Sequence, residues 1–390
     1  MDGVAQLDDF HFGTPDAEPW NRRRYGGSRA SDPRSSYEID RDRIIHSDTF
    51  RALQYKTQVQ GLIRARWPRV FRTRLNHVLE VAQIARGLSR EVGANEALSE
   101  AIALAHDLGH PPFGHAGERA LRAELQRRGL EDWNANLHSL VVVDDVEAAF
   151  IEFRGLDLTW STREGIARHS TPFDVPETAG EFVEGPNAGL EAQIVDASDI
   201  FAWLSHDLDD ALAGTYMTLD EVAAADSVLF DLVESAMRRW GDRPADVWPE
   251  GEKEALVRQR LRAMLLYRLI NDAASATKVA LETHGILTAA DVRSAEERVV
   301  KPSPAYASLV SALLETLTHR YYRSRDVSES DAVATKLING LFAALIAQPL
   351  EIPPRFRVGD DVVNTATYVA SLNDHSAAEL ARQFGVEADF

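Results

Sequence analysis

The sequence predicts an all-α protein. Two observations support this: apolar residues recur at helical spacing through most of the chain after residue 36, and convincing alternating strands are few. The 390 residues suffice for one large or two ordinary globular domains. We expect a polar, flexible arm over residues 1–36, a helical core over residues 37–215 and a helical carboxyl-terminal region over residues 216–390.

The expected helices follow one another along the chain. Residues 74–90 place an apolar stripe on one helical face, and Asn95 can cap a second helix that runs to Leu108. This helix should end at Gly109, because Pro111 and Pro112 cannot continue it. Residues 241–251 are typical of a loop. Further helical patterns cover residues 190–212, 254–283, 305–323, 329–346 and 377–384.

Composition excludes several kinds of chemistry. The chain has no cysteine, which rules out disulfides, thiolate zinc sites, iron–sulfur clusters and cysteine nucleophiles. A bound metal must therefore use nitrogen and oxygen ligands, which suit Mg, Mn, Fe, Co, Ni or Zn. No secretory pattern and no uncharged apolar run of roughly 18 residues is found, so we expect a cytoplasmic protein without a membrane span.

The charge is strongly acidic but unevenly distributed. A net charge of −19 disfavours general nucleic-acid binding, which depends on neutralising phosphates. The first third of the chain is nevertheless rich in arginine, and a basic pocket in an acidic shell suits a small polyanion. The arginines before Arg34 fit ordinary surface residues better, so a nucleic-acid partner of the arm is the less favoured alternative.

One short segment concentrates the residues that bind metals. Residues 106–118 hold three of the 12 histidines together with Asp107 and Glu118. Because neighbouring side chains on a helix diverge by about 100°, His106 and Asp107 can share a metal only with ligands from other elements. His77 and Asp199 are suitable suppliers. Such a site favours hydrolysis of a phosphoester or phosphoanhydride bond, most plausibly in a nucleotide.

Other residues near these positions suit acid catalysis and substrate contact. Glu118 lies three residues after His115, one helical turn away, and a carboxylate there would orient the imidazole as a general acid. Asp199, Trp203 and Asp207 share one helical face. Taken alone, Trp203 fits core packing better than substrate contact. For His138 and His169, structural roles are favoured over functional ones.

Several strings resemble those of a known family. The order of His77, His106-Asp107 and Asp199 resembles the ligands of HD-domain phosphohydrolases. Longer strings are similar to bacterial deoxyguanosinetriphosphate triphosphohydrolases and, more distantly, to the vertebrate SAM- and HD-domain dNTPase. These strings are Asp40-Arg-Asp-Arg-Ile-Ile-His46-Ser, Phe50-Arg-Ala-Leu-Gln-Tyr-Lys56-Thr-Gln58-Val59, Arg72-Thr-Arg-Leu-Asn-His77 and His106-Asp-Leu-Gly-His-Pro-Pro-Phe-Gly-His-Ala-Gly-Glu118.

The resemblance implies an HD-domain core and cleavage of a dNTP, with dGTP favoured, into deoxynucleoside and triphosphate by attack at the α-phosphorus. It implies a divalent metal, Mn or Mg above the others, and a homo-oligomer, either a hexamer or a tetramer. It also assigns roles: metal ligands His77, His106, Asp107 and Asp199; catalytic residues His115 and Glu118; and substrate contacts Gln58, Val59, Arg74, His110, Asn136, Trp203 and Asp207.

Three positions depart from the family pattern, so the sequence does not identify the base of the nucleotide. Trp203 stands where a tyrosine is usual, Asn136-Leu-His138 replaces Asn-x-Gln, and residues 373–376 read Asn-Asp-His-Ser in place of a Thr-Asp-Arg-Tyr-like string. Two alternatives also stay open. One is an HD-domain phosphohydrolase of another nucleotide, either a second messenger or a monophosphate. The other is a nucleotide sensor without catalysis.

Overall fold

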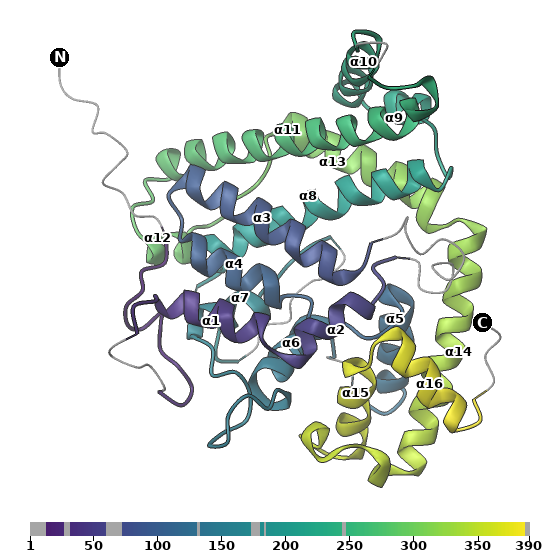
Figure 1. The fold of residues 1–390 in the computed structure, drawn as a ribbon. Coiled ribbons are helices and arrows are strands. Elements are labelled where there is room, and N and C mark those ends of the chain that lie inside the picture. The colour runs from purple at the N-terminus through teal and green to yellow at the C-terminus, as the bar shows by residue number, and fades with distance from the viewer. Residues whose placement is uncertain are drawn as a thin grey trace.

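A computed structural model describes residues 13–26, 32–59, 72–130, 133–172, 180–182, 185–243 and 247–386. Within these ranges the chain forms helices and three isolated β-bridges, and no strand, so the prediction of an all-α protein is confirmed (Figure 1). The expected helices appear within a few residues of their predicted bounds.

Three helices form the centre of the molecule: α3 (Arg74–Val92), α4 (Glu96–Ala105) and α8 (Leu190–Ala213), which pack on one another (Figure 1). A capping box between Thr73 and Asn76 starts α3, and the Asn95 side chain caps α4 as predicted. The second helix ends at Ala105 instead of Leu108, because the chain turns there before Gly109 and the prolines.

The other elements surround this centre. The helix α11 runs along α3 and α8, whereas α1 and α7 pack against α4 (Figure 1). The predicted helix over residues 305–323 changes to a π-helical turn, η6, at Thr318. The remaining bounds are α1 (Ser36–Ile45), α2 (Asp48–Ala52), η2 (Leu53–Tyr55), α5 (Gly114–Gln126), α6 (Ala135–Val141), η4 (Val142–Val146), α7 (Trp160–Ala167), α9 (Leu219–Ala225), α10 (Ser227–Gly241), η5 (Glu250–Glu252), α11 (Lys253–Thr283), α12 (Ala289–Ser294), α13 (Pro304–Leu317), η6 (Thr318–Tyr322), α14 (Arg325–Ala347), η7 (Pro349–Glu351), η8 (Pro354–Phe356), α15 (Asp361–Ser371) and α16 (Asp374–Gln383).

A second apolar cluster joins α5 to the carboxyl-terminal helices α14, α15 and α16 (Figure 1). It buries Leu121 of α5 against Leu341 and Phe342 of α14. By length and composition α14 is apolar enough to cross a membrane. Its apolar residues pack against α5, α15 and α16 in this second cluster.

The described part of the expected arm packs against the core. Thr14 donates from its backbone nitrogen and its hydroxyl to the buried Glu191 carboxylate, at 2.8 and 2.7 Å. Arg23 forms a buried ion pair with Asp40 at 2.8 Å. Residues 13–26 therefore differ from a flexible arm, because buried acids of the core satisfy their polar groups. Residues 1–12 and 27–31 of the arm lie outside the described part of the chain.

The carboxyl-terminal region also holds the loop after α4. The ammonium of Lys56 donates to the carbonyls of His110, at 2.6 Å, and Ala370, at 2.9 Å. The Asp374 carboxylate accepts from the backbone nitrogens of Thr57, at 3.0 Å, and Phe113, at 2.9 Å. Burial, together with the charge of Arg74, lowers the pKa of Lys56 to about 7. The carboxyl-terminal region thus braces the most histidine-rich segment of the core.

Candidate active site

Four buried side chains from three helical segments converge at the centre of the molecule. His77 lies in the first turn of α3, His106 and Asp107 directly follow α4, and Asp199 lies in the middle of α8. The Nε2 atom of His77 lies 2.9 Å from Asp199 Oδ1 and 3.9 Å from Asp107 Oδ2. His106 Nε2 lies 3.5 Å from Asp107 Oδ1 and 4.0 Å from Asp199 Oδ1.

The tautomer of His106 shows that this cluster fits a cation. Its Nδ1 lies 2.7 Å from the Ala103 carbonyl, which can only accept, so Nδ1 carries the proton. The Nε2 lone pair then points toward two carboxylates, and among the described residues this buried atom has no hydrogen-bond partner. Two imidazoles and two carboxylates within reach of one point are ligands for a divalent metal.

His169 joins the same cluster, although sequence reasoning favoured a structural role for it. Its Nε2 lies 3.2 Å from Asp199 Oδ2, its Nδ1 lies 2.6 Å from Asp196 Oδ1, and its ring centroid is 4.8 Å from that of His106. Arg298 forms an ion pair with Asp196 behind it. His169 follows α7, and only the packing of α7 on α8 places it beside Asp199.

The protonation of the cluster is set by competition between burial and pairing. Burial alone would lower the pKa of His77, but its bond to Asp199 and the charges of Asp199 and Asp107 raise it. Burial would raise the pKa of Asp107, yet the Arg74 guanidinium and nearby histidines hold it well below its usual value. Burial lowers the pKa of His106. Without a metal, the His77 imidazole thus favours its protonated form.

Metal affinity should therefore rise with pH. A cation that binds His77 competes with a proton, because the bond to Asp199 and the charges of Asp199 and Asp107 raise the pKa of this imidazole. Each proton displaced steepens the dependence by up to about tenfold per pH unit below that pKa. Titration calorimetry with Mn²⁺ at pH 6 to 8, in two buffers of different ionisation enthalpy, measures the protons released. A flat affinity over this range would contradict the expectation.

The pair of His115 and Glu118 lies at the start of α5. Phe113 and Gly114 both have positive φ, which turns the chain into the helix. His115 Nδ1 lies 3.6 Å from Glu118 Oε2. Burial would raise the pKa of Glu118, but the contact with His115 and the neighbouring positive charges lower it to about 2. At neutral pH, Glu118 is thus an ionised acceptor beside a half-exposed imidazole.

A cavity of about 390 Å³ brings this pair and the metal cluster together. That volume is within the range of small-molecule sites. Its lining includes both predicted catalytic residues and three of the four predicted metal ligands; His106 lies behind them in the cluster. Six of the seven predicted substrate contacts also line it: Gln58, Val59, Arg74, His110, Trp203 and Asp207.

Asn136 is the seventh predicted substrate contact, and the structure places it outside this cavity. It is 2 % exposed, it does not line the cavity, and its amide donates to the carbonyl of His169 at 2.8 Å. The reason is that α6 lies behind the loop after α4. The Asn136 side chain therefore reaches the backbone of His169 instead of the space where a substrate would bind.

Arg74 keeps unused donors in the cavity wall. One terminal nitrogen lies 2.7 Å from Asp107 Oδ2, whereas Nε and Nη2 are buried and have no hydrogen-bond partner among the described residues. Beside it, burial and the charge of Arg74 lower the pKa of His110 to about 3, so this imidazole is neutral. A guanidinium that lines a cavity and has two unpaired donors suits an oxyanion such as phosphate.

The cavity also has lining residues that sequence reasoning missed. Thr318 and Tyr322 come from η6, and Arg323 follows it; Arg119 and Arg122 come from α5, and Thr171 follows His169. The Tyr322 hydroxyl donates to Asp207 Oδ2 at 2.5 Å. The arginines of α5 lie one and two turns after His115, a spacing that could have revealed them. No local pattern indicates that η6 places Tyr322 beside Asp207 of α8.

The helical core and the buried His–Asp cluster are those of an HD-domain protein, and comparison with protein families leads to the same class. The HD domain model matches residues 74–204, and the phosphohydrolase-associated domain model matches residues 300–383. HD domains bind divalent metals, and the chain is an HD-domain hydrolase.

Relatives narrow the class to one family. The chain is 35 % identical over 364 residues, covering 92 % of this chain and 91 % of the relative, to a deoxyguanosinetriphosphate triphosphohydrolase-like protein of Geobacter sulfurreducens. A protein of the same name from Thiobacillus denitrificans is 36 % identical over 366 residues, covering 91 % and 92 %. One from Azoarcus sp. is 35 % identical over 377 residues, covering 94 % of each. The chain belongs to the family of deoxyguanosinetriphosphate triphosphohydrolase-like proteins.

Proposed function

We propose that this protein is a metal-dependent dNTP triphosphohydrolase that releases a deoxynucleoside and inorganic triphosphate. The observation that carries the proposal is the composition of one cavity. His77, Asp107 and Asp199 of the metal-type cluster, the pair of His115 and Glu118, and Arg74 all line it. The names of the relatives, which refer to dGTP, support the choice of substrate.

His77, His106, Asp107 and Asp199 would hold the divalent cation, with Mn and Mg favoured and Fe, Co, Ni or Zn compatible. Bound there, it would polarise a phosphoryl oxygen and activate water. The water oxygen forms a bond to the α-phosphorus while the bond from that phosphorus to the 5′-oxygen breaks. The leaving alkoxide needs a proton, which the His115 imidazole donates, and ionised Glu118 orients that ring.

The rest of the cavity suits a nucleoside. Arg74 and neutral His110 face the triphosphate, and Arg119, Arg122 and Arg323 add positive charge to the lining. Gln58 and Val59 pack at the deoxyribose, where they exclude a ribose 2′-hydroxyl. Trp203 stacks on the sugar or base. The Asp207 carboxylate, which accepts a hydrogen bond from the Tyr322 hydroxyl, also accepts one from the 3′-hydroxyl of the substrate. We favour dGTP among the four dNTPs.

Products identify the reaction. The purified protein, with Mn²⁺ or Mg²⁺, should convert dNTPs into deoxynucleoside and triphosphate in equal amounts and leave NTPs largely intact. In ¹⁸O-labelled water, the label should appear in the triphosphate, because water attacks the α-phosphorus. Release of dNMP or dNDP would contradict this mechanism. Faster hydrolysis of a monophosphate or a cyclic dinucleotide would favour another HD-domain phosphohydrolase, and binding without turnover would favour a sensor.

Assembly and location belong to the same proposal. We propose a cytoplasmic homo-oligomer, a hexamer or a tetramer, which light scattering of the purified protein would measure. A monomer at micromolar concentration would contradict it.

A further inference from the structure

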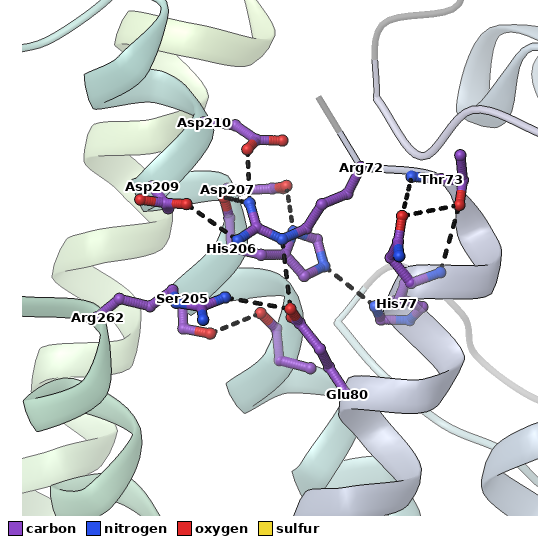
Figure 2. Close-up of polar contacts among 12 residues, drawn as sticks. Arg72, Thr73, His77, Glu80, Ser205, His206, Asp207, Asp209, Asp210 and Arg262 are labelled. Carbon is purple, nitrogen blue, oxygen red and sulfur yellow. Dashed lines mark hydrogen bonds and ion pairs between the residues drawn. The ribbon is translucent and has the colours of Figure 1, made fainter. Parts of the chain in front are cut away.

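A row of hydrogen bonds leads away from metal ligand His77, on the side opposite the cluster. His77 Nδ1 lies 3.0 Å from His206 Nε2, and His206 Nδ1 lies 2.9 Å from Asp207 Oδ1. The other oxygen of Asp207 accepts from the Tyr322 hydroxyl at 2.5 Å. Figure 2 shows the first part of this row, from α3 across to α8. His206 is fully buried and does not line the cavity, whereas Asp207 and Tyr322 do.

Only one arrangement of protons lets His77 bind a cation. To bind a cation, His77 must leave Nε2 unprotonated and carry its ring proton on Nδ1; His206 Nε2 is then the acceptor, and His206 Nδ1 donates to the Asp207 carboxylate. His77 Nδ1 must then donate to His206, which leaves the Nε2 lone pair of His77 facing Asp199 and Asp107. Every bond in this row has one donor and one acceptor, and the order starts at the Asp207 carboxylate.

The surrounding ion pairs hold both ends of the row in place. Arg72, two residues before α3, donates to Asp209 at 2.9 Å and to Asp210 at 2.6 Å, both near the end of α8. It also contacts Glu80 on α3 at 3.4 Å, and Arg262 of α11 donates to the same carboxylate at 3.1 Å (Figure 2). These contacts fix the distance between α3 and α8, and hence between His77 and His206.

We propose that His206 is a positioning residue that couples the nucleoside end of the cavity to the metal end. It fixes the tautomer and ring direction of His77, and it is itself oriented by Asp207 and Tyr322. A ligand that contacts Asp207 and Tyr322 therefore changes the orientation of His206 and, through it, the affinity of His77 for the cation. Partners of this kind behind metal-binding histidines commonly change metal affinity by about 10- to 100-fold. The coupling to a nucleoside rests on the proposed function, but the effect on metal affinity does not.

Three substitutions separate the two ends of the row. His206→Gln places an amide oxygen near the position of Nε2, where it can still accept from His77, but loses the bond to Asp207. His206→Asn places its amide near Nδ1, where it can donate to Asp207, but loses His77. His206→Phe keeps the ring volume and loses both bonds. Thermal unfolding without metal reports any purely structural effect of each change.

The first measurement is Mn²⁺ affinity of the full chain without nucleotide, by titration calorimetry. We expect the Kd to rise at least about tenfold in H206N and H206F and to stay within threefold of wild type in H206Q. If H206F does not fold, the comparison of H206N with H206Q decides, because both remove one bond from the same position. Equal Mn²⁺ affinity in that pair would overturn the proposal, and so would a wild-type protein that binds no Mn²⁺.

The second measurement adds deoxyguanosine at saturating concentration to the same titrations. Wild type should bind Mn²⁺ more tightly in its presence, and H206Q, which has lost the bond to Asp207, should show no such change. A full deoxyguanosine effect in H206Q would overturn the coupling. If dNTP turnover instead gives dNMP or dNDP while the pattern of Mn²⁺ affinities persists, the proposed function fails and the positioning role of His206 stands.

Discussion

Replacing His115 with alanine should lower kcat for dNTP hydrolysis by about 10²- to 10⁴-fold, the range typical of a lost general acid. The imidazole lines the cavity, and its ring contacts Glu118 and lies outside the metal cluster. Mn²⁺ affinity of the variant should therefore stay within twofold of wild type. Steady-state kinetics together with Mn²⁺ titration would measure both, and an unchanged kcat would disprove the catalytic assignment.

The chain offers a matched control for this experiment. His375 and Glu379 form another histidine–glutamate pair on one face of a helix, at 4.0 Å, but they are exposed on α16 and outside the cavity. His375→Ala should leave kcat and Mn²⁺ affinity unchanged. Glu118→Gln should lower kcat because the imidazole loses its ionised partner. The variant that combines H115A with E118Q should be little slower than H115A, since the two residues act as a unit.

Gly109→Ala should destabilise the protein by about 3 kcal/mol, the upper end of the usual cost of overpacking, because the added atom meets backbone that cannot move away separately. A Cβ at this position would lie 2.1 Å from the backbone nitrogen of Ser139 and 2.5 Å from the carbonyl oxygen of Ala135. Both neighbours belong to α6, so either that helix or the loop after α4 must shift. Chemical denaturation followed by circular dichroism would measure the loss.

The same substitution should also weaken Mn²⁺ binding, because a shift of either α6 or the loop disturbs the contacts that hold His106. Ser139 Oγ accepts from the Gly109 nitrogen at 2.8 Å and donates to the His106 carbonyl at 2.7 Å. As a control, Gly87→Ala lies inside α3 with nothing within 4 Å of its Cβ. It should stabilise the protein by about 0.5–1 kcal/mol through helix propensity. A Gly109 variant as stable as the Gly87 variant would contradict the packing described here.

His138 explains one departure from the family pattern in the same region. Its Nδ1 donates to the Gly109 carbonyl at 2.8 Å, and burial lowers its pKa to about 4. It is thus a neutral brace of the loop, in agreement with the structural role expected from the sequence. It does not line the main cavity.

Local sequence signals predicted the long helices α3, α8, α11, α13 and α14 and several residues of the cavity, whereas Gln58, Val59 and Arg74 were expected only from the family resemblance. Apolar spacing located α3 and α8, a capping asparagine located α4, and a cluster of histidines identified the loop between α4 and α5. The grouping of Asp199, Trp203 and Asp207 followed from a spacing of four residues on one helix. These features need information only from residues near in sequence.

Contacts between segments far apart in the sequence could not be predicted from such local signals. Periodicity shows which face of a helix is buried but not which neighbour covers it. His169 reaches Asp199 only because α7 packs on α8, and Tyr322 reaches Asp207 only because a π-helical turn follows α13. The packing of residues 13–26 escaped prediction for the same reason, since Glu191 and Asp40 bind polar residues that have no apolar pattern.

The contacts of Lys56 and Asp374 have a consequence for how the protein is made. The loop that contains His110 and Phe113 is fastened by Ala370 and Asp374, more than 250 residues later in the chain. A ribosome synthesising this protein exposes every cluster residue long before it exposes those two. The nascent chain can therefore form α3, α4 and α8 early, yet its loop stays unfastened until translation has passed residue 374. Synthesis of the last carboxyl-terminal helices, more than synthesis of the HD domain, therefore sets the moment at which this loop is held in place.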